Sequence, residues 1–106
     1  MISEDEVEKA LHWLLDNSGA IGDAKADQIR TQRMTKHIKA LEMKRHAGTV
    51  GAQEREAYAS QNYLEALEKE ARAAGHYETM LSLRGGKEMT IEAWRSMAAN
   101  HRNARI

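Results

Sequence analysis

The chain has 106 residues, 16 of them basic and 16 acidic, and it contains neither proline nor cysteine. Without cysteine it has no disulfide framework, no thiolate zinc site and no cysteine nucleophile. Because a chain of this length buries only roughly 60–65% of its unfolded surface, we expect residues 1–106 to form a single domain with a thin core.

The composition predicts helices with few large apolar side chains. Of the hydrophobic residues, 17 are alanine, whereas leucine, isoleucine and valine together number 16 and phenylalanine is absent. The good helix formers Ala, Glu, Lys, Arg, Leu and Met dominate, and strand-favouring residues are scarce. The predicted fold is all-α: an elongated helical hairpin or a small bundle with coiled-coil-like packing, complete in one chain or completed by dimerisation.

A first helix is expected over residues 4–17. Ser3 and Glu6 have the spacing of a capping box, in which each side chain satisfies a free backbone N–H at the helix start. Apolar residues at i, i+3, i+4, i+7 and i+8 predict its buried face. They are Val7, Ala10, Leu11, Leu14 and Leu15. The run Asn17-Ser18-Gly19 should end this helix, with Gly19 as a left-handed cap.

A second helix is expected over residues 23–46, capped by Asp23 and ended by Gly48. One apolar strip contains Met34, Ile38 and Leu41, and a second contains Ala26, Ile29 and Ala40. Four basic side chains fall in a narrow arc between the strips: Arg30, Arg33, His37 and Lys44. Either these side chains extend around a helix–helix contact and pair with acidic segments, or they form a stripe that follows a phosphate backbone.

A short helix over residues 52–58 and a long helix over residues 61–103 complete the predicted elements, with Ser60 as the cap between them. Near-heptad spacing predicts the buried face of the long helix. Its members are Leu64, Leu67, Ala71, Ala74 and Leu81. Two glycines within a helix cost about 1 kcal/mol each relative to alanine, and they can also mark a hinge. We expect the helix to continue through Gly85-Gly86 with a bend or kink.

Charge is segregated along the chain although the formal net charge is zero. Residues 1–24 carry six acids and one lysine (−5), and residues 25–46 carry seven basic residues and two acids (+5). Residues 47–80 carry three basic residues and six acids (−3), and residues 81–106 carry five basic residues and two acids (+3). Blocks of opposite sign favour antiparallel helix pairing, within one chain or between copies, and leave separate acidic and basic surfaces for partners.

The sequence contains no recognisable catalytic or metal-binding pattern. The five histidines are scattered singly, and Gly85-Gly86-Lys87 lacks the upstream glycine and the following hydroxyl of a phosphate-binding loop. We therefore expect a protein that is not an enzyme and that holds no metal and no cofactor. Aromatic and basic side chains together can stack bases and hold phosphates. Such residues occur near one another in the second half of the chain: Tyr58, Tyr63, Tyr77 and Trp94 with Arg55, Arg84 and Arg95. Trp94 and Arg95, with Arg102 near the end of the chain, are the candidate binding residues of this part. Such aromatics also serve as the large members of an alanine-rich core.

A resemblance to a known family is carried by the second half of the chain. The matching residues are Glu54-Arg55-Glu56-Ala57-Tyr58-Ala59-Ser60, Tyr63, Tyr77-Glu78-Thr79 and Ile91-Glu92-Ala93-Trp94-Arg95, with Asn100 and Arg102. This pattern resembles a family of small helical proteins encoded by tailed phages and prophages, whose genes tend to lie among recombination and replication functions. The resemblance implies a bacterial setting and no particular activity, and Gly85-Gly86 departs from the pattern.

The expected location is the cytoplasm of a bacterial host cell. No apolar run approaches the roughly 18 residues needed to span a bilayer, and the start Met-Ile-Ser-Glu-Asp-Glu is too acidic for a signal peptide. We therefore expect no membrane contact.

Three functions remain open at this point. The first is a non-enzymatic phage adaptor or inhibitor that binds a protein of the host or of the phage, in host-defence or recombination machinery. The second is a nucleic-acid-binding accessory protein that uses Arg30, Arg33, His37 and Lys44, with Arg102 and Arg105 near the end of the chain. The third is a structural coiled-coil homodimer. The candidate residues for binding a partner protein or nucleic acid are Arg30, Arg33, His37, Lys44, Trp94, Arg95 and Arg102.

Overall fold

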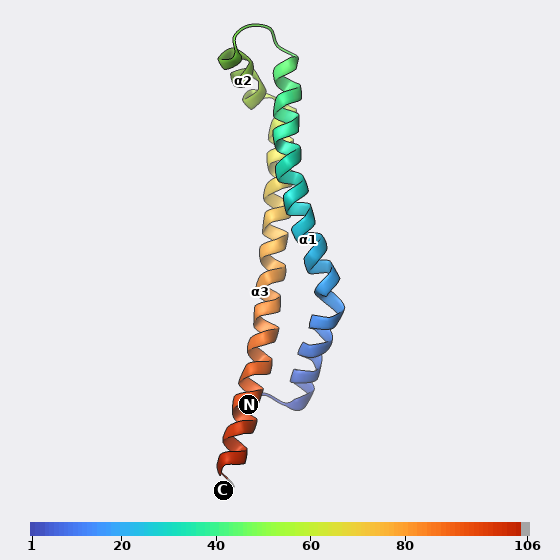
Figure 1. Cartoon of the computed structure of the whole chain (residues 1–106), viewed down its shortest axis with the longest axis vertical. Coiled ribbons are helices and arrows are strands. Elements are labelled where there is room, and N and C mark those ends of the chain that lie inside the picture. The colour runs from blue at the N-terminus through green and yellow to red at the C-terminus, as the bar shows by residue number, and fades with distance from the viewer. Residues whose placement is uncertain (105–106) are drawn as a thin grey trace. The chain divides into compact units, whose positions relative to one another are not determined.

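The computed structural model describes residues 1–104, and this part of the chain is all-α, as predicted (Figure 1). Its helices are α1 (Glu4–Lys44), α2 (Val50–Ala59) and α3 (Gln61–Ala104). The chain divides into two compact units, which we describe separately. Unit 1 contains Met1–Gly22 and the part of α3 from Thr79 onward, and unit 2 contains Asp23–Glu78.

Unit 2 is a helical hairpin, in which the second half of α1 packs antiparallel to the first half of α3 (Figure 1). The buried hydroxyl of Thr35 lies 3.4 Å from the carbonyl oxygen of Ala66, which brings the two helices into close contact. Ala57 of α2 is fully buried. Small residues at these positions let the helix backbones approach closely, so the core of the unit is thin.

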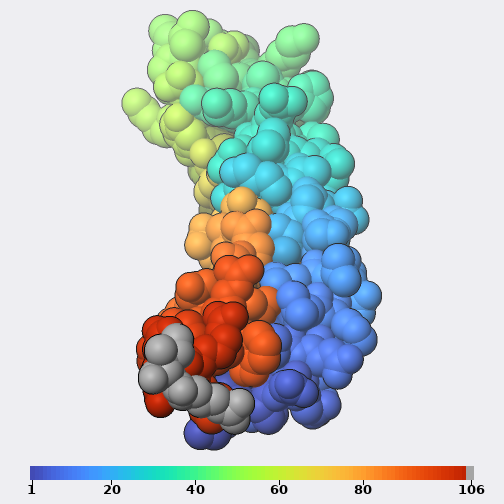
Figure 2. All heavy atoms as spheres, turned by 60° about the horizontal axis from the view of Figure 1, so that its bottom comes forward, coloured from blue at the N-terminus to red at the C-terminus, as the bar shows by residue number. Residues whose placement is uncertain are grey.

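Unit 1 pairs the start of α1 with the end of α3, as Figure 2 shows for the blue and the orange-to-red segments. Its buried side chains include Val7, Ala10 and Ile21 of α1 and Met80 of α3. The ammonium group of Lys87 lies 5.9 Å from the centroid of the Trp13 ring, at the outer limit of a cation–π contact. Both halves of the predicted hairpin pairing are therefore present, one in each unit.

The contact faces of α1 and α3 follow a seven-residue repeat with alternating steps of three and four, which is the spacing of a coiled-coil seam. In α1 the buried or half-buried positions that follow this repeat are 7, 10, 14, 17, 21, 24, 28, 31, 35, 38 and 42, and positions 13, 39 and 43 beside it are also half-buried. In α3 they include 63, 66, 70, 73, 77 and 80, and later 87, 91, 94 and 98. Polar side chains occupy much of this seam in unit 2, including Gln28, Thr31 and Thr35.

The predicted break between residues 17 and 23 is wrong, because α1 runs through it without interruption. Asn17 does not end the helix: its amide donates to the carbonyl oxygen of Trp13 at 2.9 Å, one turn back. Gly19 and Gly22 meet nothing within 4 Å where a Cβ would be, so they face open space. Asp23 is consequently an interior helical residue and not a cap. The repeat continues through Ile21 and Ala24, and this packing outweighs the weak local preference of glycine.

The predicted buried faces are also partly wrong. Val7 and Ala10 are buried as expected, but Leu15 is 76% exposed and Leu11 is 45% exposed. In α3, Leu64 and Leu67 are likewise exposed, whereas the neighbouring Ala66 is buried. The seam therefore selects positions by the register of the repeat, and several of the largest apolar residues lie outside it.

The caps predicted at Ser3 and Ser60 and the start of the long helix are confirmed. The Ser3 hydroxyl accepts from the backbone N–H of Glu6 at 3.2 Å, which is half of the predicted capping box. Ser60 separates α2 from α3, and its hydroxyl accepts from the backbone N–H of Tyr63 at 3.1 Å. α1 ends at Lys44 and not at residue 46. α3 continues through Gly85-Gly86 to Ala104.

The glycines give a first testable prediction. Gly86 lies within α3 and meets nothing within 4 Å, so Gly86→Ala should raise the free energy of unfolding by about 0.5–1 kcal/mol, since alanine is the better helix former. Gly48, in the turn after α1, has a φ of 112°, which side chains rarely adopt. Gly48→Ala should therefore lower the same quantity by about 1 kcal/mol or more. Urea unfolding followed by circular dichroism measures the free energy of unfolding of both variants. Equal changes in the same direction would contradict the different conformations assigned to the two glycines.

Candidate interaction site

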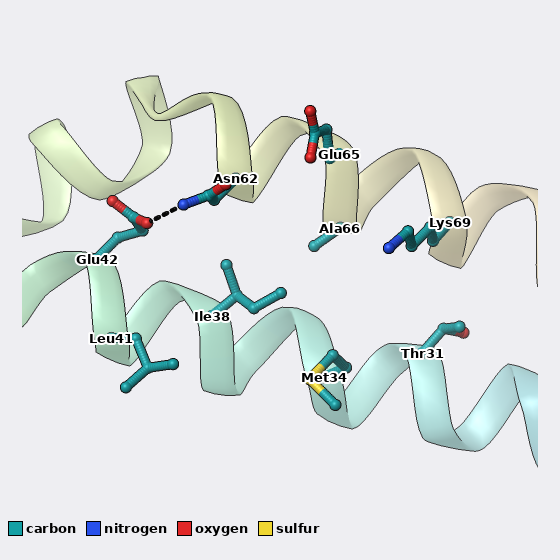
Figure 3. A pocket seen from close by; sticks show the side chains of 9 residues that line it. All are labelled: Thr31, Met34, Ile38, Leu41, Glu42, Asn62, Glu65, Ala66 and Lys69. Atoms are coloured by element: carbon teal, nitrogen blue, oxygen red, sulfur yellow. Dashed lines mark hydrogen bonds between the residues drawn. The ribbon is translucent and has the colours of Figure 1, made fainter.

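A groove of about 330 Å³ lies between α1 and α3 in unit 2 (Figure 3). Its lining combines apolar and charged side chains: Thr31, Met34, Ile38, Leu41, Glu42, Asn62, Glu65, Ala66 and Lys69. Ile38 points toward α3 and is half-buried. Met34 and Leu41, which form an apolar strip with Ile38 in the sequence, are 48% and 46% exposed. The groove therefore has an apolar side that the unit itself leaves uncovered.

The outer face of α1 carries a second, shallower hollow that brings three of the predicted residues together. It is lined by Ala26, Ile29, Arg30, Arg33, Met34 and His37. Met34 lines both hollows, so the two form one continuous surface within unit 2. We call this the basic-apolar surface and define it by Ile29, Arg30, Arg33, Met34, His37 and Leu41. Lys44 is exposed at the last position of α1, outside both hollows.

The positive charge on this surface is only partly neutralised. Arg30 forms an ion pair with Asp27 one turn earlier on the same helix. Within the described residues, neither Arg33 nor Lys44 has an ion pair within 4.0 Å. Within the described residues, none of the four side chains forms an ion pair with an acidic segment, because Arg30 pairs with Asp27 of its own basic segment. Arg33 and Lys44 remain available to an acidic partner.

A buried carboxylate closes one end of the groove. Glu42 is 6% exposed, and its carboxylate accepts from the amide of Asn62 at 2.7 Å and from the guanidinium of Arg45 at 3.2 Å (Figure 3). The Asn62 hydrogen bond lowers the pKa of Glu42 below its usual 4.5, and Arg45 contributes in the same direction, against the opposing effect of burial. The contact joins α1 to the first turn of α3 and fixes the side chains at that end of the groove.

This lowered pKa predicts acid sensitivity. Because the folded state binds the Glu42 proton less readily than the unfolded state, its contribution to stability is complete above about pH 4.5 and is lost as the pH falls through the lower folded pKa. We expect Glu42→Gln and Asn62→Ala to flatten the decrease in unfolding free energy below pH 4.5, measured by urea unfolding across a pH series. The exposed Glu68→Gln serves as the control. A wild-type pH slope in Glu42→Gln would contradict this assignment.

A second polar cluster holds α2 against the hairpin of unit 2. The Lys39 ammonium donates to the Tyr58 hydroxyl at 2.7 Å and lies 3.7 Å from the Glu54 carboxylate. The pKa of Lys39 is raised by the Tyr58 hydrogen bond and by Glu54, although burial opposes the shift. Tyr58 also contacts Tyr63 edge to face, with the ring centroids 5.3 Å apart. These two tyrosines therefore have structural partners, as does Tyr77, whose ring lies under Lys25.

The other predicted group lies in unit 1, on the last turns of α3. A hollow there is lined by Glu92, Trp94, Arg95, Ser96, Ala98, Ala99, His101 and Arg102. Trp94 is half-buried at a seam position, and Arg95 pairs with Glu92 at 3.5 Å on its own helix. Trp94 therefore serves the seam of unit 1, and Arg102 is exposed. Arg105 lies outside the described residues.

Sequence reasoning found the basic residues of the surface but missed the exposure of its apolar members. Helical spacing places Met34 and Leu41 on one apolar strip with Ile38 and does not distinguish which of the three is covered. The seven-residue repeat of α1 separates them: residue 38 is in the seam, whereas residues 34 and 41 precede seam positions 35 and 42. Apolar spacing does not reveal this period over the whole helix, because five of its seam positions carry polar residues: Asn17, Gln28, Thr31, Thr35 and Glu42.

Comparison of the chain with protein-family models, curated proteins and solved structures finds no match. The resemblance to phage proteins therefore remains a prediction. No cluster of three or more histidine, cysteine, aspartate or glutamate side chains within residues 1–104 is arranged to bind a metal ion. In the same part of the chain, none of the helices has the length and apolar character to cross a membrane.

Proposed function

We propose that this chain is a non-enzymatic helical adaptor or inhibitor, and that its basic-apolar surface binds an acidic amphipathic helix of a protein partner. The observation that carries the proposal is the exposure of Met34 and Leu41 beside Arg33, which has no ion pair within the described residues. Large apolar side chains next to unneutralised cations form a surface on which a partner's leucines and carboxylates can both be satisfied.

The mixture of side chains favours a protein partner over nucleic acid. A surface that follows phosphates needs continuous positive charge, whereas here Asp27 neutralises Arg30 and Ile29 and Met34 interrupt the basic residues. Among the residues that line the outer hollow there is no phenylalanine, tyrosine or tryptophan, and His37 is the one ring on which a base could stack. The resemblance to phage proteins supports a partner from the bacterial host or from the phage.

Copurification from a nuclease-treated bacterial lysate tests the proposal. Tagged wild-type chain should retain a stoichiometric protein, and Arg33→Glu should lose it because the substitution reverses the charge at the centre of the surface. Arg72→Glu, which changes an exposed arginine on α3, is the matched control and should retain the protein. Two results would instead favour the nucleic-acid function. One is capture that disappears when the lysate is treated with nuclease, and the other is binding of the chain to any acidic polymer that weakens steeply as salt is added.

A further inference from the structure

The accessible surface of the chain is larger than that of a typical folded protein of its mass. It amounts to 7860 Å², whereas a folded monomer of 12.0 kDa has about 6,000 Å². The surplus of about 1,900 Å² exceeds the roughly 800 Å² that each partner buries in a standard protein interface. The chain therefore has enough uncovered surface for an interface with a second copy, and the exposed leucines show where apolar side chains contribute to it.

The start of α1 has the chemistry that the basic-apolar surface requires. In residues 4–22, Leu11 and Leu15 are exposed, and Glu8 and Asp16 lie beside them at the i, i+3, i+7, i+8 spacing of one helical face. Lys9 is the only lysine or arginine of this segment, and Asp5 pairs with it at 3.0 Å. His12 is exposed on the same face, one turn from both Glu8 and Asp16. Glu8 and Asp16 have no ion pair within the described residues.

We infer that residues 4–22 of a second copy dock antiparallel on the basic-apolar surface. This inference rests on the proposed function, because it takes that surface as a site for an acidic helix. Leu11 and Leu15 are about 6 Å apart along the helix axis, close to the about 7.5 Å between Ile29 and Met34. An antiparallel helix with Leu11 near Met34 places Leu15 near Ile29, Glu8 near Lys36 and His37, and Asp16 near Arg30.

The pairing is reciprocal, because each copy carries one acidic segment and one basic-apolar surface. A closed symmetric dimer, in which residue i contacts j and j contacts i, satisfies both. In this arrangement the segregation of charge between residues 1–24 and 25–46 determines the direction in which two copies pair. It favours the antiparallel pairing of copies and disfavours the parallel one, in which like charges would meet.

A charge exchange between copies tests the inference. The first variant is Glu8→Lys with Asp16→Lys, and the second is Arg30→Glu with Lys36→Glu, the residues that face those acids in the proposed register. Light scattering coupled to gel filtration should give a dimer for wild type and about a tenfold or greater rise in the dimer Kd for either variant alone. An equimolar mixture of the two variants should form a heterodimer, because both of its interfaces are again complementary. Glu68→Lys, on α3, is the control and should leave the dimer intact.

The outcomes separate this inference from the proposed function. A monomeric wild-type chain would overturn the dimer, and so would two monomeric variants that fail to pair when mixed while each remains helical. If that monomer still retained a nuclease-resistant protein through Arg33, the adaptor function alone would stand. A dimer that re-forms in the mixture, with no other protein retained, would support the inference and remove the adaptor function.

Discussion

Ala66→Asp should separate the helices of unit 2 and lower the free energy of unfolding by at least about 3 kcal/mol. Ala66 is 4% exposed in the seam of the hairpin, where its carbonyl oxygen lies close to the hydroxyl of Thr35. An aspartate there would be larger than the space left by alanine and would carry a buried charge with no basic partner on the seam. Glu42 and Glu65, which line the same groove, would add repulsion, and Lys69 in the same lining would offset only part of it from its exposed position.

Urea unfolding followed by circular dichroism measures this effect, and Ala71→Asp is the matched control. Ala71 is an exposed position on the same helix, so its substitution should change the free energy of unfolding by about 0.5 kcal/mol or less. Equal losses in the two variants would show that helix propensity, and not the seam, determines the stability of this segment.

Met34→Glu and Leu41→Glu should each weaken the binding of an acidic partner by about tenfold or more while leaving the chain folded. Both side chains are nearly half exposed, so the substitutions remove little packing within unit 2. A bound helix would bury them, and the substituted carboxylate would be desolvated and would repel the partner's acids. A tenfold loss corresponds to about 1.4 kcal/mol, within the range for one buried apolar side chain.

Calorimetry with the protein recovered by copurification measures these affinities, and circular dichroism checks that each variant is folded. Met89→Glu is the control, because Met89 is a large apolar residue of unit 1 that is 73% exposed. If Met89→Glu weakened binding as much as Met34→Glu, the basic-apolar surface would not be the binding site.

Only part of the candidate site could be predicted from the sequence. Arg30, Arg33 and His37 could be grouped from helical spacing alone, because residues three and four apart share a helix face. Whether each basic side chain has an ion-pair partner could not be predicted from the sequence. Arg30 pairs with Asp27, whereas Arg33 has no ion pair within the described residues. Those differences depend on which rotamers and neighbours the folded helix provides.

The polar cluster at Glu42 illustrates a signal that the sequence does not contain. Asn62 is 20 residues away along the chain and reaches Glu42 only because the turn containing Gly48 and the helix α2 return the chain toward α1. A carboxylate in a charged helix reads as solvent-exposed from composition, yet Glu42 is buried with two donors. Hydrogen bonds satisfy it in the seam, which is the condition for burying such a group.

The sequence by itself determined that this protein is helical, because its composition lacks strand formers and proline. It also placed the start of α1 at Ser3, the short α2 and the boundary at Ser60, since caps are local interactions between residues three or four apart. Tertiary structure decided that α1 passes through Gly19 and Gly22, and that Leu11, Leu15, Leu64 and Leu67 lie outside the seam. Local preferences of about 1 kcal/mol per glycine are weaker than the packing of a continuous seven-residue repeat, so the partner helix sets the register and the faces that remain exposed.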